Sequence, residues 1–154
     1  MQLADFLDCE AIKTSLPGGN KRSLLQQLAN LAAQRLGVDA ATIGGALNER
    51  EQIGSTGFGQ GVAIPHAKIE GLTQAYGLFA RLGEPVDYKA IDGHPVDLVF
   101  LLLSPPDAGA QHLKALAAIS RVTRDAATLE RLRGARSRDA LAAVLMGADE
   151  REAT

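Results

Sequence analysis

The sequence has few of the features that mark several large classes of protein. It has one cysteine, Cys9, in 154 residues, which excludes an internal disulfide and a cysteine-rich metal site. Its uninterrupted apolar runs, such as Leu98 to Leu103, are far shorter than the roughly 20 residues that span a bilayer. The N-terminus, Met1 to Phe6, lacks the basic and long apolar segments of a secretory signal. We therefore expect a reduced, cytoplasmic protein that does not insert into a membrane.

Aromatic residues are also scarce, and neither sign of charge is in large excess. Aromatic residues make up 4% of the chain, which argues against binding single-stranded nucleic acid by base stacking. Sixteen basic and eighteen acidic residues give a net charge of −2, which argues against a surface that grips nucleic acid or anionic lipid. The segment from Arg121 to Arg138 is locally basic. It could meet nucleic acid or an acidic protein, or be a solvated helix surface. The composition favours the solvated surface, so we expect no nucleic-acid partner.

The length suits one domain, and its turn signals and apolar periodicity predict five helices. The first begins at Asn20 or Ser23 and ends at Gly37. The second has Asp39 as its N-cap and closes with residues 48–51. Three more are expected over residues 109–124, 128–132 and 137–146. In the third helix we expect one apolar stripe formed by Leu113, Leu116, Ala117 and Ser120.

Three strands are predicted between the early and late helices. Val62–Ile64 and Leu78–Leu82 are short apolar segments bounded by proline and glycine. Val96–Leu103 is almost continuously apolar, which is typical of a strand covered on both faces. We therefore predict an α/β fold in which a small mixed β-sheet is flanked by helices on both faces. The residues after Gly147 are polar, and we expect them to fray.

The chemistry-bearing residues gather around a glycine-rich loop. Residues 54–61 contain four glycines with Ser55 and Thr56 among them, and His66 follows the strand Val62–Ile64 and Pro65. Glycines allow close approach of a backbone to an anion, and loop N–H groups can bind phosphate oxygens. A neutral imidazole is a competent nucleophile. The pattern thus indicates a phosphate-handling site at His66, although a hydrogen-bonded histidine in a turn remains an alternative.

The other charged and ring-bearing candidates each leave two interpretations open. His112 falls at the start of a predicted helix, where it could donate to a phosphoryl group on His66 or simply bond solvent or a loop carbonyl. Arg50 could neutralise phosphate or pair with a neighbouring glutamate. His94 lies in a predicted exposed turn. No spacing supplies a third ligand beside His66 and His112, so we expect no metal site.

These residues resemble a known family. The segment from Glu49 through Gly-Ser-Thr-Gly to Pro65-His66, together with Asp92-Gly93-x-Pro95-Val96 and His112-Leu113, is similar to enzyme IIA of the bacterial phosphotransferase system, fructose/mannitol type. The Gly-Ser-Thr-Gly stretch, the Pro-Val-Asp-Leu strand and the expected free-standing domain resemble the nitrogen-regulatory branch, enzyme IIA-Ntr. The resemblance implies a type-2 EIIA domain over residues 1–147, followed by a polar tail over residues 148–154.

The resemblance also implies a function. It makes His66 the phosphoryl acceptor, through Nε2, with Nδ1 held by a backbone carbonyl. It places His112 in a hydrogen bond to the phosphoryl group, and Arg50, Ser55 and Thr56 in the same pocket. The donor would be an HPr-like phosphocarrier (NPr), no cofactor would be needed, and the regulated targets would be proteins such as potassium transport proteins or sensor kinases. The alternative is a sugar-specific IIA component that passes the phosphoryl group to a IIB domain of a permease.

Overall fold

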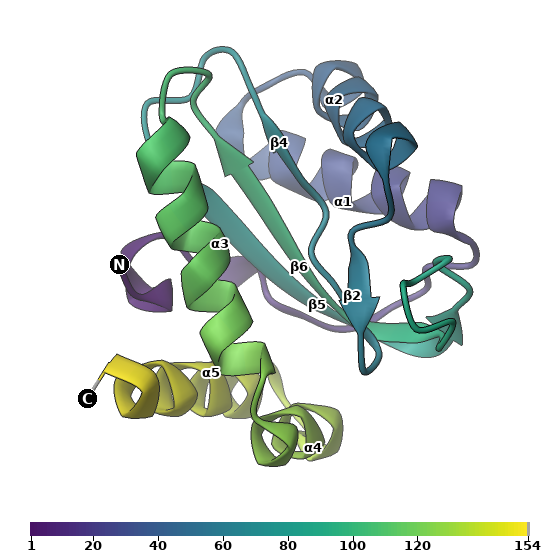
Figure 1. Ribbon diagram of the computed structural model, residues 1–154, viewed down its shortest axis with the longest axis vertical. Coiled ribbons are helices and arrows are strands. Elements are labelled where there is room, and N and C mark those ends of the chain that lie inside the picture. Colours follow the sequence, from purple (N-terminus) through teal and green to yellow (C-terminus); the bar gives the residue numbers. More distant parts are fainter. Residues whose placement is uncertain (154) are drawn as a thin grey trace.

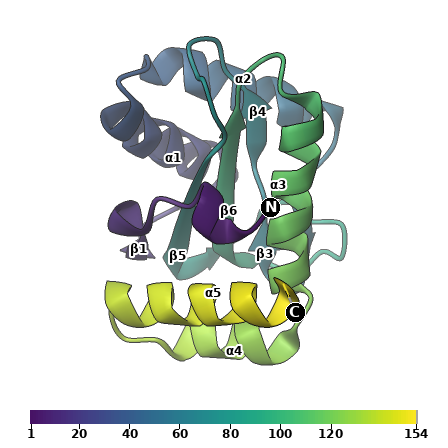
Figure 2. The ribbon, with the colours of Figure 1, turned by 90° about the vertical axis from the view of Figure 1, so that its left-hand side faces the viewer.

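The computed structural model describes the backbone of residues 1–153 and the side chains of residues 1–151. Helices cover both faces of one six-stranded sheet, and Figure 2 shows α1 and α2 on one side and α3 on the other. This confirms the predicted α/β class and the mixed sheet. The helices are η1 (Leu3–Asp5), η2 (Cys9–Ala11), α1 (Lys21–Leu36), α2 (Ala40–Ile53), α3 (Gly109–Thr123), α4 (Ala126–Gly134) and α5 (Arg138–Ala153). The strands are β1 (Lys13–Leu16), β2 (Gly57–Gly59), β3 (Val62–Ala63), β4 (His66–Lys68), β5 (Tyr76–Val86) and β6 (Val96–Ser104).

Strand β6 is the centre of the sheet (Figure 1). It pairs antiparallel with β5 along one edge, and with β3 and then β4, both parallel, along the other. Its side chains alternate between two separate cores. Leu98, Phe100 and Leu102 pack under α3, α4 and α5, whereas Val99 and Leu101 pack under α1 and α2. The two-sided burial predicted from the apolar run is confirmed.

Three predicted helix ends are confirmed by their capping contacts, whereas the second helix does not close with residues 48–51 but continues to Ile53. The Asn20 side chain accepts a hydrogen bond from the Ser23 N–H at 2.8 Å, and Gly37 closes α1 with φ of 70°. Asp39 accepts from the Thr42 N–H at 3.1 Å and so caps α2. These signals act within four residues of the chain, which is why the sequence alone shows them.

Several strands differ from the expectation. β1 was not predicted; it pairs parallel with β5 at the edge of the sheet. β5 does not stop before Gly83 but continues to Val86. His66 is not in a turn: it begins β4, whose residues pair with β6 from Leu102 onward. Pro65 interrupts the edge strand only briefly, because β3 and β4 both run along β6.

The expected apolar stripe of α3 is wrong. Leu113 is 68% exposed, whereas Ala115, Ala118, Ile119 and Val122 are buried against the sheet. The buried positions are the expected ones moved by two residues, and two residues rotate a helix face by about 200°. Small alanines, rather than leucines, therefore face β6.

The expected fraying after Gly147 is also wrong, because α5 continues to Ala153. Ala148 is buried, and the Asp149 carboxylate is 6% exposed. Asp149 accepts hydrogen bonds from the N–H groups of Leu3 at 2.8 Å and Ala4 at 3.3 Å. The first and last helical turns of the chain are thus held together.

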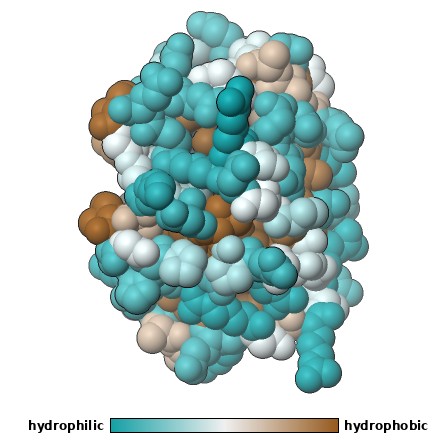
Figure 3. All heavy atoms as spheres, turned by 90° about the vertical axis from the view of Figure 1, so that its right-hand side faces the viewer, coloured by the Kyte–Doolittle hydropathy of each residue, from teal (hydrophilic) through white to brown (hydrophobic). Residues whose placement is uncertain are grey.

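Polar and charged side chains cover most of the face shown in Figure 3, with apolar side chains in separate patches. Over the described part of the chain, no helix is long and apolar enough to cross a membrane. Two of the exposed large apolar residues, Ile53 and Leu113, belong to the elements that carry the candidate site, α2 and α3.

Candidate functional site

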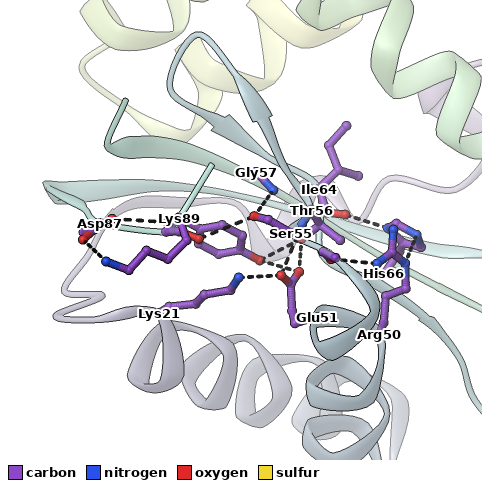
Figure 4. Close-up of polar contacts among 12 residues, drawn as sticks. Lys21, Arg50, Glu51, Ser55, Thr56, Gly57, Ile64, His66, Asp87 and Lys89 are labelled. Carbon is purple, nitrogen blue, oxygen red and sulfur yellow. Dashed lines mark hydrogen bonds and ion pairs between the residues drawn. The ribbon is translucent and has the colours of Figure 1, made fainter. Parts of the chain in front are cut away.

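The ring of His66 is held in one orientation by its own backbone neighbourhood. His66 Nδ1 lies 2.7 Å from the carbonyl oxygen of Ile64 (Figure 4). Because a carbonyl oxygen can only accept, this bond places the hydrogen of the neutral ring on Nδ1. The lone pair is therefore on Nε2. This geometry matches the orientation that the family resemblance implied.

Arg50 contacts that second nitrogen. Its Nε donates to His66 Nε2 at 3.2 Å, and its Nη1 donates to the carbonyl oxygen of Gly54 at 2.8 Å. The donation by Arg50 agrees with a lone pair on Nε2. The Arg50 side chain thus connects the last turn of α2 to the His66 ring and to the start of the glycine-rich loop.

His112 lies beside His66. The centroids of the two rings are 5.4 Å apart, and the planes are tilted by 52°. His112 is only 8% exposed, and its Nδ1 lies 2.7 Å from the hydroxyl oxygen of Ser104, the last residue of β6. An open cavity of about 410 Å³ lies over both rings and is lined by Ala46, Glu49, Arg50, Ile53, His66, Ala67, Lys68 and His112. The structure thus brings together three of the five predicted site residues.

Both imidazoles favour the neutral form. Burial lowers the pKa of His66 below its usual 6.5, and the charge of Arg50 adds to the effect, while the bond to Ile64 and the charge of Glu51 oppose it. Burial lowers the pKa of His112 to about 4, with further contributions from His66 and Lys68. At neutral pH the cavity therefore contains two uncharged rings beside the Arg50 guanidinium.

The hydroxyls of Ser55 and Thr56 do not line this cavity. Thr56 is buried, and its Oγ1 contacts the carboxylate of Glu51 and the hydroxyl of Tyr88. Ser55 Oγ accepts from the Gly57 N–H at 3.1 Å and lies 3.5 Å from the carbonyl oxygen of Tyr88. Both side chains bond to other parts of the protein rather than facing the cavity. A phosphoryl-binding role for them stays a prediction.

Sequence reasoning missed two charged residues that line the cavity, Glu49 and Lys68. Lys68 could have been found, because residues two apart on a strand share a face, but the predicted strand ended at Ile64 and did not include His66. His94 is exposed, as expected. Among the described residues, no group of three His, Cys, Asp or Glu side chains could hold a metal ion.

The geometry can now be compared with known proteins. The family described as "Phosphoenolpyruvate-dependent sugar phosphotransferase system, EIIA 2" matches residues 5–147. The chain belongs to this family. A nitrogen regulatory protein of Bradyrhizobium diazoefficiens is 46% identical over 145 residues, which cover 94% of this chain and 95% of the relative. A fructose-specific EIIA component of Haloferax volcanii is 35% identical over 137 residues, which cover 88% and 89%.

The solved structures agree with this assignment to the EIIA family. The crystal structure of nitrogen regulatory protein IIA-Ntr from Neisseria meningitidis matches with a TM-score of 0.87 and 35% sequence identity, covering 93% of this chain and 98% of that one. The 46% identity to the nitrogen regulatory protein of Bradyrhizobium diazoefficiens exceeds the 35% identity to the fructose-specific component. Within the EIIA family, the chain therefore groups with the nitrogen-regulatory members, as the glycine-loop motif had indicated.

Proposed function

We propose that His66 accepts a phosphoryl group on Nε2 from an HPr-like phosphocarrier (NPr), and that the phosphorylation state regulates target proteins in the cytoplasm. The observation that supports this proposal most directly is the fixed orientation of the His66 ring. The Ile64 carbonyl holds Nδ1–H, so the Nε2 lone pair of a neutral imidazole lies at a cavity that Arg50 and His112 also line. Family membership supports the same chemistry.

The transfer needs no proton to leave His66. The Nε2 lone pair attacks phosphorus, the P–N bond to the donor imidazole breaks, and the donor ring takes the electron pair of that bond. Nδ1–H stays bonded to the Ile64 carbonyl throughout. Because one P–N bond replaces another, positioning and charge stabilisation account for most of the catalysis. No metal or organic cofactor is required for this step.

In this scheme Arg50 and His112 donate hydrogen bonds to the phosphoryl group. Arg50 releases Nε2, and its guanidinium then donates to phosphoryl oxygens while Nη1 keeps the chain near Gly54. The Ser104 hydroxyl, 2.7 Å from Nδ1 of His112, is able to donate to that nitrogen. We propose the tautomer in which it does so, because the ring hydrogen is then on Nε2 and available to a phosphoryl oxygen. Ser55 and Thr56 contribute by supporting the glycine-rich loop.

The output of the modification is regulatory. A phosphoryl group adds about −1.5 to −2 charges at neutral pH, which changes the proteins that can dock over the cavity. The names of the nitrogen regulatory relatives support a regulatory output. The targets that we propose are proteins such as potassium transport proteins or sensor kinases. The 35% identity to a fructose-specific component favours a second candidate, in which the phosphoryl group passes on to a IIB domain of a permease.

The test is phosphorylation in solution. Wild-type protein incubated with the phosphorylated HPr-like carrier should gain one acid-labile, base-stable phosphate, and ³¹P NMR should place it on Nε2. His66→Ala should gain none, and His94→Ala, which changes an exposed histidine, should be labelled like wild type. Undiminished labelling of His66→Ala would refute the assignment. Rapid transfer onward to a fructose-permease IIB domain would favour the second candidate.

A further inference from the structure

One buried carboxylate joins four segments of the chain behind the acceptor loop. The side chain of Glu51, in the last turn of α2, is 7% exposed. Its Oε2 accepts from Lys21 Nζ at 2.7 Å and from the Thr56 N–H at 3.2 Å, and its Oε1 accepts from the Tyr88 hydroxyl at 3.0 Å (Figure 4). The Thr56 hydroxyl also contacts Oε1. Lys21 comes from the start of α1, and Tyr88 follows β5.

The donors keep this carboxylate charged despite its burial. Burial alone would raise the pKa of Glu51, but hydrogen bonds from Lys21, Thr56 and Tyr88 outweigh it, and the pKa lies below its usual value. Lys21 also stands 4.4 Å from the ring centroid of the buried Tyr88. A charged and fully bonded group of this kind holds its partners in one arrangement and tolerates few others.

An unbroken line of hydrogen bonds leads from Glu51 to the acceptor ring. The Thr56 N–H donates to Glu51, the Ile64 N–H donates to the carbonyl oxygen of Thr56 at 2.9 Å, and His66 Nδ1 donates to the carbonyl oxygen of Ile64 at 2.7 Å. On its other side, Glu51 is adjacent in sequence to Arg50, which contacts His66 Nε2. The last turn of α2 therefore holds the partners of both nitrogens of His66: it supplies Arg50 for Nε2, and through Glu51 it anchors the segment that supplies the Ile64 carbonyl for Nδ1.

We propose that Glu51 is a positioning residue for His66. It anchors the glycine-rich loop so that the Ile64 carbonyl keeps the hydrogen on Nδ1 and the lone pair on Nε2. Glu51 is not among the residues that line the cavity, so it positions the ring through the loop. Its charge also raises the pKa of His66, an effect that Tyr88→Phe, which keeps the charge, leaves in place. The inference deepens the proposed phosphoryl acceptance and rests on it, but the state of the ring can be measured without any phosphoryl donor.

The main variant is Glu51→Gln, which keeps the shape of the side chain but replaces one acceptor oxygen with an amide donor. One of the N–H or hydroxyl donors then loses its partner, and the loop loses its fixed position. The ¹⁵N shifts of His66 should move toward a mixture of the two neutral tautomers. The phosphorylation rate at saturating carrier should fall by roughly tenfold to a hundredfold, because small misplacement of reacting groups is costly. KM for the carrier should stay unchanged.

Tyr88→Phe removes one donor to Glu51 and keeps the charge of the Glu51 carboxylate. It should change the His66 ¹⁵N shifts and the phosphorylation rate in the same direction as Glu51→Gln, but by a smaller amount. Tyr76→Phe is the matched control. It removes a comparable tyrosine–carboxylate bond, from Tyr76 to Asp8 at 2.7 Å, on β5, which lies across β6 from His66. It should lower stability and leave the His66 nitrogen shifts and the rate unchanged.

The outcomes separate the two proposals. A folded Glu51→Gln protein with wild-type nitrogen shifts would overturn the positioning role, even if its rate or stability fell. If Glu51→Gln does not fold, Tyr88→Phe decides by the same measurement, and unmoved shifts there would equally overturn it. A wild-type protein that gains no phosphate would refute the proposed function. The nitrogen shifts of the variants would still decide whether Glu51 orients the ring.

Discussion

The burial of His112 should make the protein less stable as the pH falls from 7 to 5. The pKa of this ring is lowered to about 4 from the value of 6.5 that applies in an unfolded chain. The unfolded state therefore binds a proton at a pH where the folded state does not. Stability from this group is complete above about pH 6.5 and is lost progressively as the pH falls toward 4.

The size of the effect follows from the two pKa values. At about 1.4 kcal/mol per pKa unit, a drop from 6.5 to about 4 amounts to a total loss of about 3 kcal/mol once the pH is below 4. Between pH 7 and pH 5 the same linkage gives a loss of about 2 kcal/mol. His66 adds to the loss with the same sign, because burial lowers its pKa as well.

Urea unfolding at pH 5, 6 and 7 measures this dependence directly. His112→Gln removes the titrating group, and its free energy of unfolding should fall by about 2 kcal/mol less than that of wild type between pH 7 and 5. His94→Gln, a change at an exposed position, is the control and should follow wild type. If wild type and His112→Gln lost the same stability over this range, the link between burial and neutrality of His112 would be wrong.

Two further substitutions test packing around the site and at the chain ends. Gly57→Ala should cost about 1–3 kcal/mol in urea unfolding, because its Cβ would lie 2.9 Å from the backbone of Ala90. Gly54→Ala, whose Cβ would meet nothing within 4 Å, should be tolerated; equal losses from the two would show that crowding is not the cause. Asp149→Ala should cost about 1–3 kcal/mol, since the buried N–H of Leu3 loses its acceptor. Wild-type stability in that variant would mean that the hydrogen bonds from Asp149 to the N-terminal turn add nothing to the fold.

Features encoded by neighbouring residues could be predicted from the sequence. Asn20 and Asp39 each reach an N–H three residues ahead, and Gly37 supplies a left-handed turn, so three helix ends were located correctly. The run from Val96 to Leu103 showed its two-sided burial by composition alone. Long-range placement was not encoded in this way. β1 is a four-residue edge strand that exists only because β5 pairs with it.

The buried face of α3 could have been predicted from the sequence. Residues 115, 118, 119 and 122 are all apolar, whereas the predicted stripe includes the polar Ser120, so the two leucines drew attention to the less hydrophobic face. The structure buries Ala115, Ala118 and Ile119. His112 precedes Ala115 by three residues and so shares its face of the helix, which brings the His112 ring to Ser104. A helix that buried Leu113 and Leu116 would turn His112 away from this position. The rotation of the helix thus follows from the requirements of the core and the site together.

The Glu49-Arg50-Glu51 sequence explains why the site was found only in part. Successive residues on a helix point about 100° apart, and these three side chains go to different places. Glu49 lines the cavity, Arg50 reaches His66, and Glu51 turns into the molecule. From sequence alone the three resemble a surface ion-pair cluster, because the partners of Glu51 include Tyr88, 37 positions away. The motif singled out His66 as the candidate acceptor, but the contacts by which Glu51 holds the loop beside it become visible only when distant segments meet.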